Sequence, residues 1–306
     1  MAMRVDDLTN FVTMAETGSI AAAAQKLGTT QPTLSKSLAR LERALRVSLV
    51  ERHARGVRLT EAGRAVLAHA RNVDLDVRDA LAAVRDLRRG DAGTVRVGVG
   101  IGIPQALVSA ACRPLLRSAK VRLEVMGGMS DSLFHAVASG EADFAVAGVK
   151  PPRETRLEWT PLFRDPMTIA AHRSHPLASA RSVGWDALAR ETWLVANVGT
   201  MTRAWFEQQF RDRDLAPPAR IIGLRGYPFF YDLAVAAGAL MLVPACIPRW
   251  ARDFGDFVEV RRPADWDSDR VVGTLARAGG YLGPAALRLK ESFAAAARRM
   301  FRELSL

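Results

Sequence analysis

The chain has 306 residues, a formal net charge of +11, and a composition that is 49% hydrophobic and 25% charged. This length predicts two or three domains with sizeable cores, and the balanced composition excludes an intrinsically disordered chain. No apolar run approaches the ~20 residues that span a bilayer, and no secretory signal is visible, so we expect a cytoplasmic protein. The two cysteines, Cys112 and Cys246, are far apart and are expected to be reduced core residues rather than a disulfide or metal site.

Two short helices are expected to meet at a tight turn within residues 19–45. Ser19 can cap the first of them, and Gly28 can end it in a left-handed conformation. Thr30 is placed to cap the second helix. Pro32 is tolerated in the first turn of that helix because its missing N–H would have no partner there. The pattern predicts a helix-turn-helix.

The second of these helices has a polar outer face. Its leucines recur at helical spacing and should face inward, which leaves Gln31, Thr33, Ser35, Lys36 and Arg40 outside. Short amide and hydroxyl groups at a helix start, followed by cations, suit a helix that enters a DNA major groove by its N-terminus. In this interpretation Arg40 holds a phosphate. An ordinary surface helix with a polar face would give the same pattern.

The stretch that follows favours DNA binding. Residues 49–60 predict two short strands around a basic turn, a wing whose three arginines suit phosphate or minor-groove contact. Between Lys26 and Arg64, nine Lys and Arg residues stand against three acidic residues, which is typical of a nucleic-acid surface. The predicted DNA-binding residues come from the helix start and the wing: Thr30, Gln31, Pro32, Thr33, Ser35, Lys36, Arg40, Arg52, Arg55 and Arg58.

A helix of nearly thirty residues is expected after the wing. Apolar residues recur at helical spacing from Glu61 to Arg89, and no proline interrupts them. So long a helix needs a partner along its length, and an antiparallel copy from a second subunit is the natural one. Packing against its own domain is the alternative. We expect residues 61–90 to form a linker and dimerisation helix.

The composition changes at the short hinge 90–93. Strand and helix patterns then alternate up to residue 149, and a second alternating set begins at residue 167. This order predicts a parallel sheet with helices on both faces, formed twice. The last strand and helix should return to the first set. We therefore expect lobe I at about 94–165 and 269–306, and lobe II at about 166–268.

The first sixty-five residues also carry a dense motif of apolar and small residues at fixed spacing: Leu8, Phe11, Val12, Ala15, Glu16, Gly18, Ser19, Ala23, Ala24, Leu27, Gln31, Pro32, Leu34, Ser35, Leu41, Glu42 and the run 58–63. This motif closely resembles the N-terminal signature of LysR-type transcriptional regulators. One departure is Arg46, which stands where the family usually has a helix-terminating glycine. Sparser motifs at 139–144, 172–178 and 235–244 resemble the effector domain of the same family.

The resemblance implies an α/β protein in three parts. An N-terminal, all-α winged helix-turn-helix spans residues 1–60 and binds promoter DNA, and the linker helix joins it to an effector domain at 94–306. That domain is similar to a two-lobed periplasmic binding protein and senses a small molecule. The resemblance also implies that the linker helix makes a homodimer and that effector domains pair further into a homotetramer, as in many relatives.

Ligands of such folds bind between the lobes, at the carboxyl ends of strands and the N-termini of the following helices. Four glycine-containing turns fit this description, although any one of them could serve only a tight turn. The hydroxyls of Ser130, Thr200 and Thr202, with backbone amides, should hold a carboxylate, and apolar walls would suit an aromatic acid. The predicted effector-binding residues are Ile101, Gly102, Ile103, Gly128, Met129, Ser130, Gly148, Val149, Gly199, Thr200, Met201, Thr202, Tyr227 and Phe229.

An enzyme built on the two lobes is the main alternative. It would need a nucleophile elbow, a complete G-x-G-x-x-G turn or a metal cluster. The glycines of residues 98–102 lack the final glycine at the required spacing, and His172 and His175 have no evident third ligand. We therefore expect no enzymatic activity, no cofactor and no metal. The basic wing argues against a third class, a ligand-binding protein without DNA function.

Overall fold

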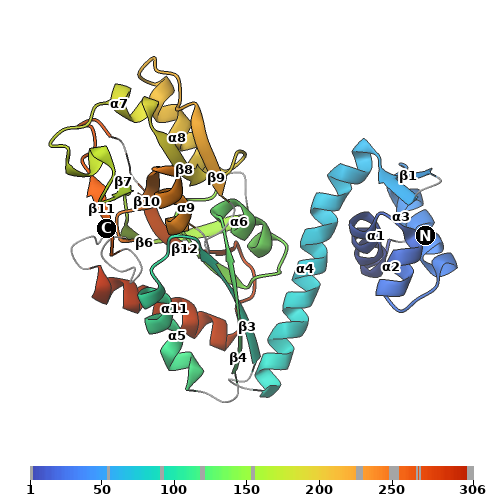
Figure 1. The fold of residues 1–306 in the computed structure, drawn as a ribbon. Coiled ribbons are helices and arrows are strands. Elements are labelled where there is room, and N and C mark those ends of the chain that lie inside the picture. Colours follow the sequence, from blue (N-terminus) through green and yellow to red (C-terminus); the bar gives the residue numbers. More distant parts are fainter. Residues whose placement is uncertain are drawn as a thin grey trace. The chain divides into compact units, whose positions relative to one another are not determined.

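The computed structural model describes residues 3–53, 56–89, 93–117, 121–152, 156–224, 230–247, 255–266, 268 and 270–301, apart from the side chains of residues 52, 88 and 89. The chain divides into two compact units, Met1–Leu87 and Arg88–Leu306. Figure 1 shows a helical N-terminal unit and a larger unit in which helices flank two sheets.

The N-terminal unit has four helices and one hairpin: α1 (Val5–Thr17), α2 (Ile20–Lys26), α3 (Gln31–Leu45), β1 (Val50–His53), β2 (Gly56–Leu59) and α4 (Glu61–Arg89). The expected helix caps are confirmed. Ser19 accepts a hydrogen bond from the backbone N–H of Ala22, and Thr30 accepts one from Thr33. Gly28 adopts a φ of +62°, the left-handed conformation expected after α2.

The core of this unit lies between α1, α3 and the start of α4. Leu34, Leu38 and Leu41 of α3 are fully buried, as their spacing predicts, and they pack with Phe11 and Met14 of α1. Burying these side chains supplies the main stabilisation of the helix-turn-helix, because each removes a large apolar surface from water.

The wing is fastened at both of its ends. The carboxylate of Glu42 in α3 accepts the backbone N–H of Leu49 at 2.7 Å, just before β1. The N–H of Val57 in β2 donates to the carbonyl of Gly18 at 2.9 Å, in the turn between α1 and α2. A Cβ on Gly56 would lie 2.3 Å from that carbonyl oxygen, so this approach requires glycine. The wing and the helices thus form one body.

Arg40 does not project from α3 as expected. Its Nε donates to Asp7 Oδ2 at 2.7 Å, its Nη2 pairs with Asp7 Oδ1, and its side chain is only 19% exposed. Asp7 in α1 is completely buried and also accepts the hydroxyl of Ser37 at 2.7 Å. A buried carboxylate needs a cation and hydrogen bonds to stay ionised. Arg40 therefore locks α3 onto α1, which corrects its assignment to a phosphate.

The second unit contains two five-stranded sheets. The first has the order β4-β3-β5-β12-β6, and its elements are β3 (Gly93–Gly100), α5 (Gln105–Leu116), β4 (Val121–Gly128), α6 (Ser130–Ala138), β5 (Phe144–Ala147), β6 (Leu157–Arg164), β12 (Val271–Arg277) and α11 (Pro284–Met300). Helices α5 and α11 lie side by side, and Ser292 of α11 donates to the carbonyl of Ala111 in α5.

The second sheet has the order β11-β7-β10-β8-β9. Its elements are β7 (Met167–His172), the 3₁₀ turn η1 (Pro176–Ser179), α7 (Trp185–Arg190), β8 (Thr192–Ala196), α8 (Met201–Arg211), β9 (Arg220–Leu224), α9 (Phe230–Ala237), β10 (Leu240–Pro244) and β11 (Phe257–Val260). One apolar core contains residues of both sheets, such as Val97 and Phe144 of the first and Leu194 and Met241 of the second.

The expectation of a parallel sheet in each lobe is confirmed for the β-α-β units and wrong for the strands that flank them. Strands β4-β3-β5 and β10-β8-β9 are parallel, as expected. Antiparallel pairs extend each sheet, through β12 and β6 in the first and through β7 and β11 in the second. The cause is the connection between lobes. The chain leaves the first sheet through β6 and returns through β12. Strand β12 therefore runs against the β-α-β strands and pairs antiparallel with both β5 and β6, whereas β6 runs in the same direction as β5.

Arg46 offers a test of local strain. It ends α3 with φ 56° and ψ 33°, a left-handed conformation that disfavours side chains with a Cβ. Arg46→Gly should stabilise the N-terminal unit by about 1 kcal/mol, because glycine adopts this conformation without that penalty. Urea unfolding followed by circular dichroism measures the effect. All six tryptophans lie beyond residue 158, so their fluorescence gives an internal control that should not change. A lower urea midpoint in Arg46→Gly than in the wild-type protein would contradict the claim that Arg46 is strained.

Asp7 should make the N-terminal unit sensitive to acid. Burial raises the pKa of its carboxyl, but hydrogen bonds from Arg40, Ser37 and the backbone of Arg4 outweigh burial and hold the pKa below its ordinary value of 3.8. A lowered folded-state pKa contributes stability above the ordinary pKa and loses it as pH falls through the folded pKa. Asp7→Asn should cost about 3 kcal/mol at neutral pH and flatten the acid limb of a stability–pH curve. Equal acid limbs in both proteins would exclude Asp7 as the cause.

Candidate functional site

The start of α3 presents polar side chains outward. Gln31, Pro32, Thr33 and Lys36 are exposed, and Ser35 is half-buried. The hydroxyl of Thr30 is already engaged, since it caps the helix and lies 2.9 Å from the Thr33 hydroxyl. Gln31 and Lys36, which are exposed, can meet a ligand without disturbing the fold.

The wing adds an exposed cation on the same rigid body. Strands β1 and β2 pair antiparallel from Val50 opposite Leu59 to His53 opposite Gly56, and Arg58 is exposed on β2. The side chain of Arg52 and the whole of Arg55, which were also predicted to contact DNA, lie outside the described residues. A polar helix start and a basic hairpin on one rigid body can meet two neighbouring parts of a DNA duplex.

A hollow of about 80 Å³ lies between the two lobes of the second unit. It forms where parallel strands end, with Ile101 after β3, Gly148 after β5, Ala196 at the end of β8 and Leu224 at the end of β9. This is where ligands bind in open α/β sheets. Six of the predicted effector residues line it: Ile101, Met129, Ser130, Gly148, Val149 and Thr202. We call it the interlobe hollow.

Other predicted residues take different places. Ile103 is buried in the apolar core, because the turn after β3 directs it inward. Thr200 caps α8, accepting from the N–H of Arg203 and donating to the carbonyl of Asn197, so its hydroxyl is occupied. Gly102, Gly128, Gly199 and Met201 do not line the hollow either. Tyr227 and Phe229 lie outside the described residues.

The start of α8 is also partly occupied. The backbone N–H of Met201 donates to Asp131 Oδ2 of α6 at 3.3 Å, which links lobe II to lobe I. This N–H group was expected to attract an effector carboxylate. In the structure the carboxylate of Asp131 takes that role, so another donor must be sought for an acidic ligand.

Eight further residues line the interlobe hollow and were not predicted from the sequence: Met167, Val195, Ala196, Leu224, Phe230, Leu242, Pro244 and Arg270. Seven of them are apolar, and most lie in predicted strands. The apolar pattern of a strand does not indicate which of its residues will face a ligand. Arg270 is the exception. Arg270 stands just before β12, and its partner Asp165 follows β6. The sequence signal for this pair was one charged residue of each sign at the two crossovers between the lobes.

Asp165, Arg270 and Cys246 form a buried cluster beside the hollow. The Asp165 carboxylate is completely buried, and Arg270 Nη1 pairs with its Oδ2. The backbone N–H and the thiol of Cys246 each donate to Asp165 at 3.0 Å. Burial raises the pKa of the Cys246 thiol strongly, and the neighbouring Asp165 charge raises it further. The thiol therefore stays protonated and acts as a hydrogen-bond donor, not as a nucleophile.

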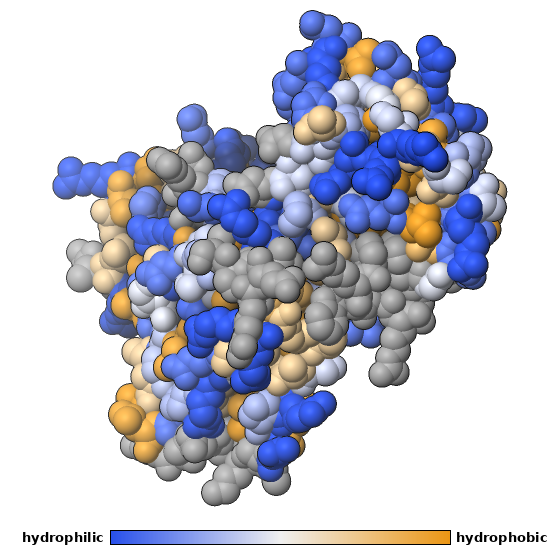
Figure 2. All heavy atoms as spheres, turned by 90° about the vertical axis from the view of Figure 1, so that its left-hand side faces the viewer, coloured by the Kyte–Doolittle hydropathy of each residue, from blue (hydrophilic) through white to orange (hydrophobic). Residues whose placement is uncertain are grey.

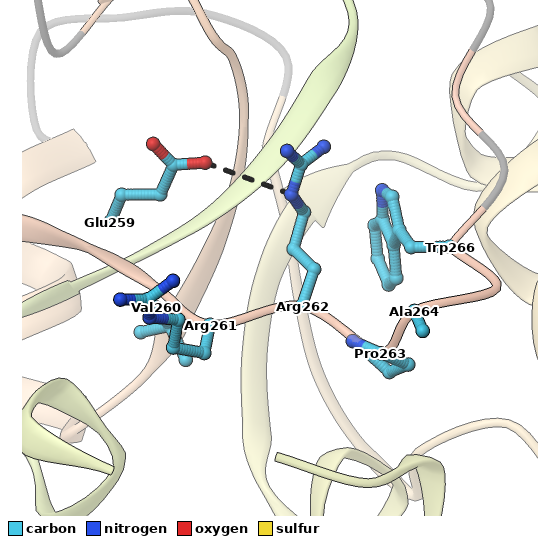
Figure 3. Close-up of a pocket in the computed structure, with 7 residues that line it drawn as sticks. All are labelled: Glu259, Val260, Arg261, Arg262, Pro263, Ala264 and Trp266. Atoms are coloured by element: carbon cyan, nitrogen blue, oxygen red, sulfur yellow. Dashed lines mark ion pairs between the residues drawn. The ribbon is translucent and has the colours of Figure 1, made fainter. Parts of the chain in front are cut away.

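A larger hollow of about 540 Å³ lies along the single stretch Glu259–Trp266 (Figure 3). Its lining is mostly polar, and Arg262 points toward Glu259 with an N–O distance of 3.6 Å. Arg262 also donates to the carbonyl of Met167. We favour the interlobe hollow as the ligand site despite its smaller volume, because it joins both lobes and several strand ends.

On the face shown in Figure 2, hydrophilic residues surround smaller hydrophobic patches. Among the residues that the structure describes, none of the helices is long and apolar enough to cross a membrane.

Comparison with known proteins identifies the two domains. Residues 5–64 match the family model "Bacterial regulatory helix-turn-helix protein, lysR family", and residues 88–298 match "LysR substrate binding domain". The HTH-type transcriptional regulator CfxR of Cupriavidus necator is 31% identical over 228 residues, which cover 73% of this chain and 70% of CfxR.

Solved structures show the same fold. The crystal structure of ArgP from Mycobacterium tuberculosis has a TM-score of 0.68 at 21% identity and covers 95% of this chain and 96% of ArgP. The crystal structure of full-length CbnR in complex with its target DNA has a TM-score of 0.52 at 23% identity. The match covers 96% of this chain and 100% of CbnR. This chain is therefore a member of the LysR family of transcriptional regulators, with a helix-turn-helix DNA-binding domain followed by a substrate-binding domain.

Proposed function

We propose that this regulator is a cytoplasmic, non-enzymatic protein that binds promoter DNA through residues 1–60 and senses a small molecule through residues 94–306. The observation that carries the proposal is the exposed, polar start of α3 on the same rigid body as the basic wing. The solved complex of the similarly folded CbnR with its target DNA supports it. Within this surface, Gln31 and Lys36 read base edges, and Arg58 contacts phosphate.

The effector is a carboxylate or an aromatic acid held in the interlobe hollow. The wall is largely apolar, with Ile101, Val149 and Leu224 among its members, and it suits an apolar or aromatic body. Ser130 and Thr202 supply hydroxyls from opposite lobes, so one ligand that contacts both has a reason to favour one lobe arrangement over another.

Residues 61–90 serve as the dimerisation helix. Apolar side chains on α4 remain exposed at Val77, Leu81, Val84 and Leu87, with exposed fractions of 39%, 60%, 51% and 86%. These positions follow helical spacing and form one stripe. A second copy of the same helix would bury the stripe. Pairing of effector domains then gives a homotetramer.

Gln31 and Arg58 test the DNA surface. On an operator selected from random sequences, Gln31→Ala should weaken specific binding by about 1–3 kcal/mol and relax one base position. Arg58→Ala should weaken all sequences alike and reduce the salt dependence by about one unit of slope. Gln25→Ala, an exposed glutamine on α2, is the matched control. Unchanged affinity and preference in Gln31→Ala would show that α3 does not read the DNA. Electrophoretic shift over a salt series measures both quantities.

Leu81 tests the assembly. Leu81→Asp should dissociate the dimer in analytical ultracentrifugation at micromolar concentration, because a carboxylate in an apolar seam loses its hydration. Ala68→Asp is the control on the same helix. Ala68 is exposed and stands thirteen residues from Leu81, about 3.6 turns, on the other face. A monomeric wild-type protein, or equal dissociation of both variants, would refute the assignment.

A further inference from the structure

The interlobe hollow is too small for a small-molecule effector as it stands. Its volume is about 80 Å³, whereas pockets that hold such molecules usually measure roughly 300–1,000 Å³. Two residues that line it, Val195 and Met167, are only 1% and 8% exposed, so solvent hardly reaches its walls. An aromatic acid of the kind proposed above therefore enters only when the two lobes move apart.

The crossover side of the hollow is held by buried contacts. Asp165 follows β6 and Arg270 precedes β12, so their ion pair joins the two segments that connect the lobes. Cys246 of lobe II donates to Asp165 at 3.0 Å through both its N–H and its thiol. Gly102 of lobe I packs on Pro244 of lobe II, where a Cβ on the glycine would lie 2.8 Å from the proline ring. The chain itself connects the lobes on this side, so they part elsewhere.

Away from the crossovers, helix α6 of lobe I contacts the start of α8 of lobe II. Asp131 Oδ2 in α6 accepts the backbone N–H of Met201 at 3.3 Å. The Met201 side chain packs against an apolar cluster of lobe I that includes Phe134 of α6. The residues next to this pair in the sequence, Ser130 and Thr202, line the hollow. The contact between α6 and α8 therefore lies at the rim of the hollow.

The carboxylate of Asp131 serves the starts of two helices. Asp131 stands in the first turn of α6, and Met201 is the first residue of α8. Both helix N-termini carry a partial positive charge, and the N–H of a first helical residue has no partner within its own helix. Hydrogen bonds of this kind, from an N–H to an ionised group, shift an equilibrium by roughly tenfold to a hundredfold. Asp131 therefore favours the arrangement in which the two helix starts are close together.

We propose that Asp131 and Met201 form a latch that holds the two lobes together and controls access to the interlobe hollow. The inference rests on the proposed function of that hollow as the effector site. Because an effector enters only while the latch is open, its apparent affinity is reduced by the open fraction. Asp131 does not itself line the hollow. It is thus a positioning residue that sets the sensitivity to the effector through the arrangement of the lobes.

A thiol placed in the hollow measures how often the latch opens. Val195→Cys changes the side-chain size little at a position that lines the hollow and is 1% exposed. In the full-length protein, the rate at which a bulky maleimide labels this thiol follows the open fraction when the lobes close faster than the reagent reacts. Asp131→Ala should raise the rate roughly tenfold. Peptide mass spectrometry separates this thiol from the native ones. Cys112, which is buried in α5, should keep its rate because it responds only to unfolding.

Two substitutions of Met201 separate the hydrogen bond from the apolar contact. Met201→Ala removes the side chain and keeps the N–H, whereas Met201→Pro removes both. Proline is tolerated at the first residue of a helix, and Thr200 before it already has the extended backbone that a following proline requires, with φ −93° and ψ 150°. Asp131→Ala should raise labelling roughly tenfold in the Met201→Ala background and add nothing in the Met201→Pro background.

Asp186→Ala is the matched control. Asp186 is the second residue of α7, as Asp131 is of α6, and it is exposed, so its loss should leave labelling unchanged. Three results would overturn the latch: unchanged labelling in Asp131→Ala, an equal effect of Asp131→Ala in both Met201 backgrounds, or a parallel rise at Cys112.

The labelling rate does not depend on what the hollow binds or on DNA. Expected labelling in a protein that shifts no DNA would keep the latch and reject the DNA-binding function. Failure of the latch in a protein that still shifts DNA would reject the latch alone.

Discussion

Both units of this regulator depend on the same constraint, that an ionised carboxylate cannot be buried without a cation beside it. Asp7 and Asp165 are each 0% exposed, and each is paired with one arginine from a distant part of the chain. Such pairs add little net stability, since desolvation offsets their attraction. They do specify which elements meet: α1 with α3 in one unit, and the two lobe crossovers in the other.

The two arginines differ in which edge they use. Arg40 donates its Nε and Nη2 hydrogens to Asp7, so the edge that would best bind a phosphate or carboxylate is already paired within the fold. Arg270 pairs with Asp165 through Nη1, and its Nε and Nη2 pack on the backbone of Gly148. The fold therefore holds the two arginines through different atoms of the guanidinium. The distinction depends on guanidinium geometry and not on exposure, since both side chains are largely buried.

Local features were predictable from the sequence, and distant pairings were not. The caps Ser19 and Thr30 and the buried face of α3 follow from residue type and helical spacing. Arg40 has the position of a DNA contact, but its partner Asp7 lies 33 residues away. Arg270 and Asp165 are separated by 105 residues, so no local pattern joins them. The glycine turns indicated the strand ends of the hollow, whereas the antiparallel strands β6 and β12 depend on how the chain crosses between lobes.

The residues that hold the wing in place are different from the exposed residues proposed to contact DNA. The Glu42 carboxylate accepts a hydrogen bond at the start of β1, and the Gly18 carbonyl accepts one from Val57 beside the close approach of Gly56. One side chain, one backbone pair and one glycine contact thus hold the hairpin. Gln31 and Lys36 stand exposed outside this framework. Substitutions at these two positions leave the scaffold intact. If the two side chains read the operator as proposed, a duplicated copy of the gene could acquire a new operator by changing them alone, while the contacts that hold the wing stay the same.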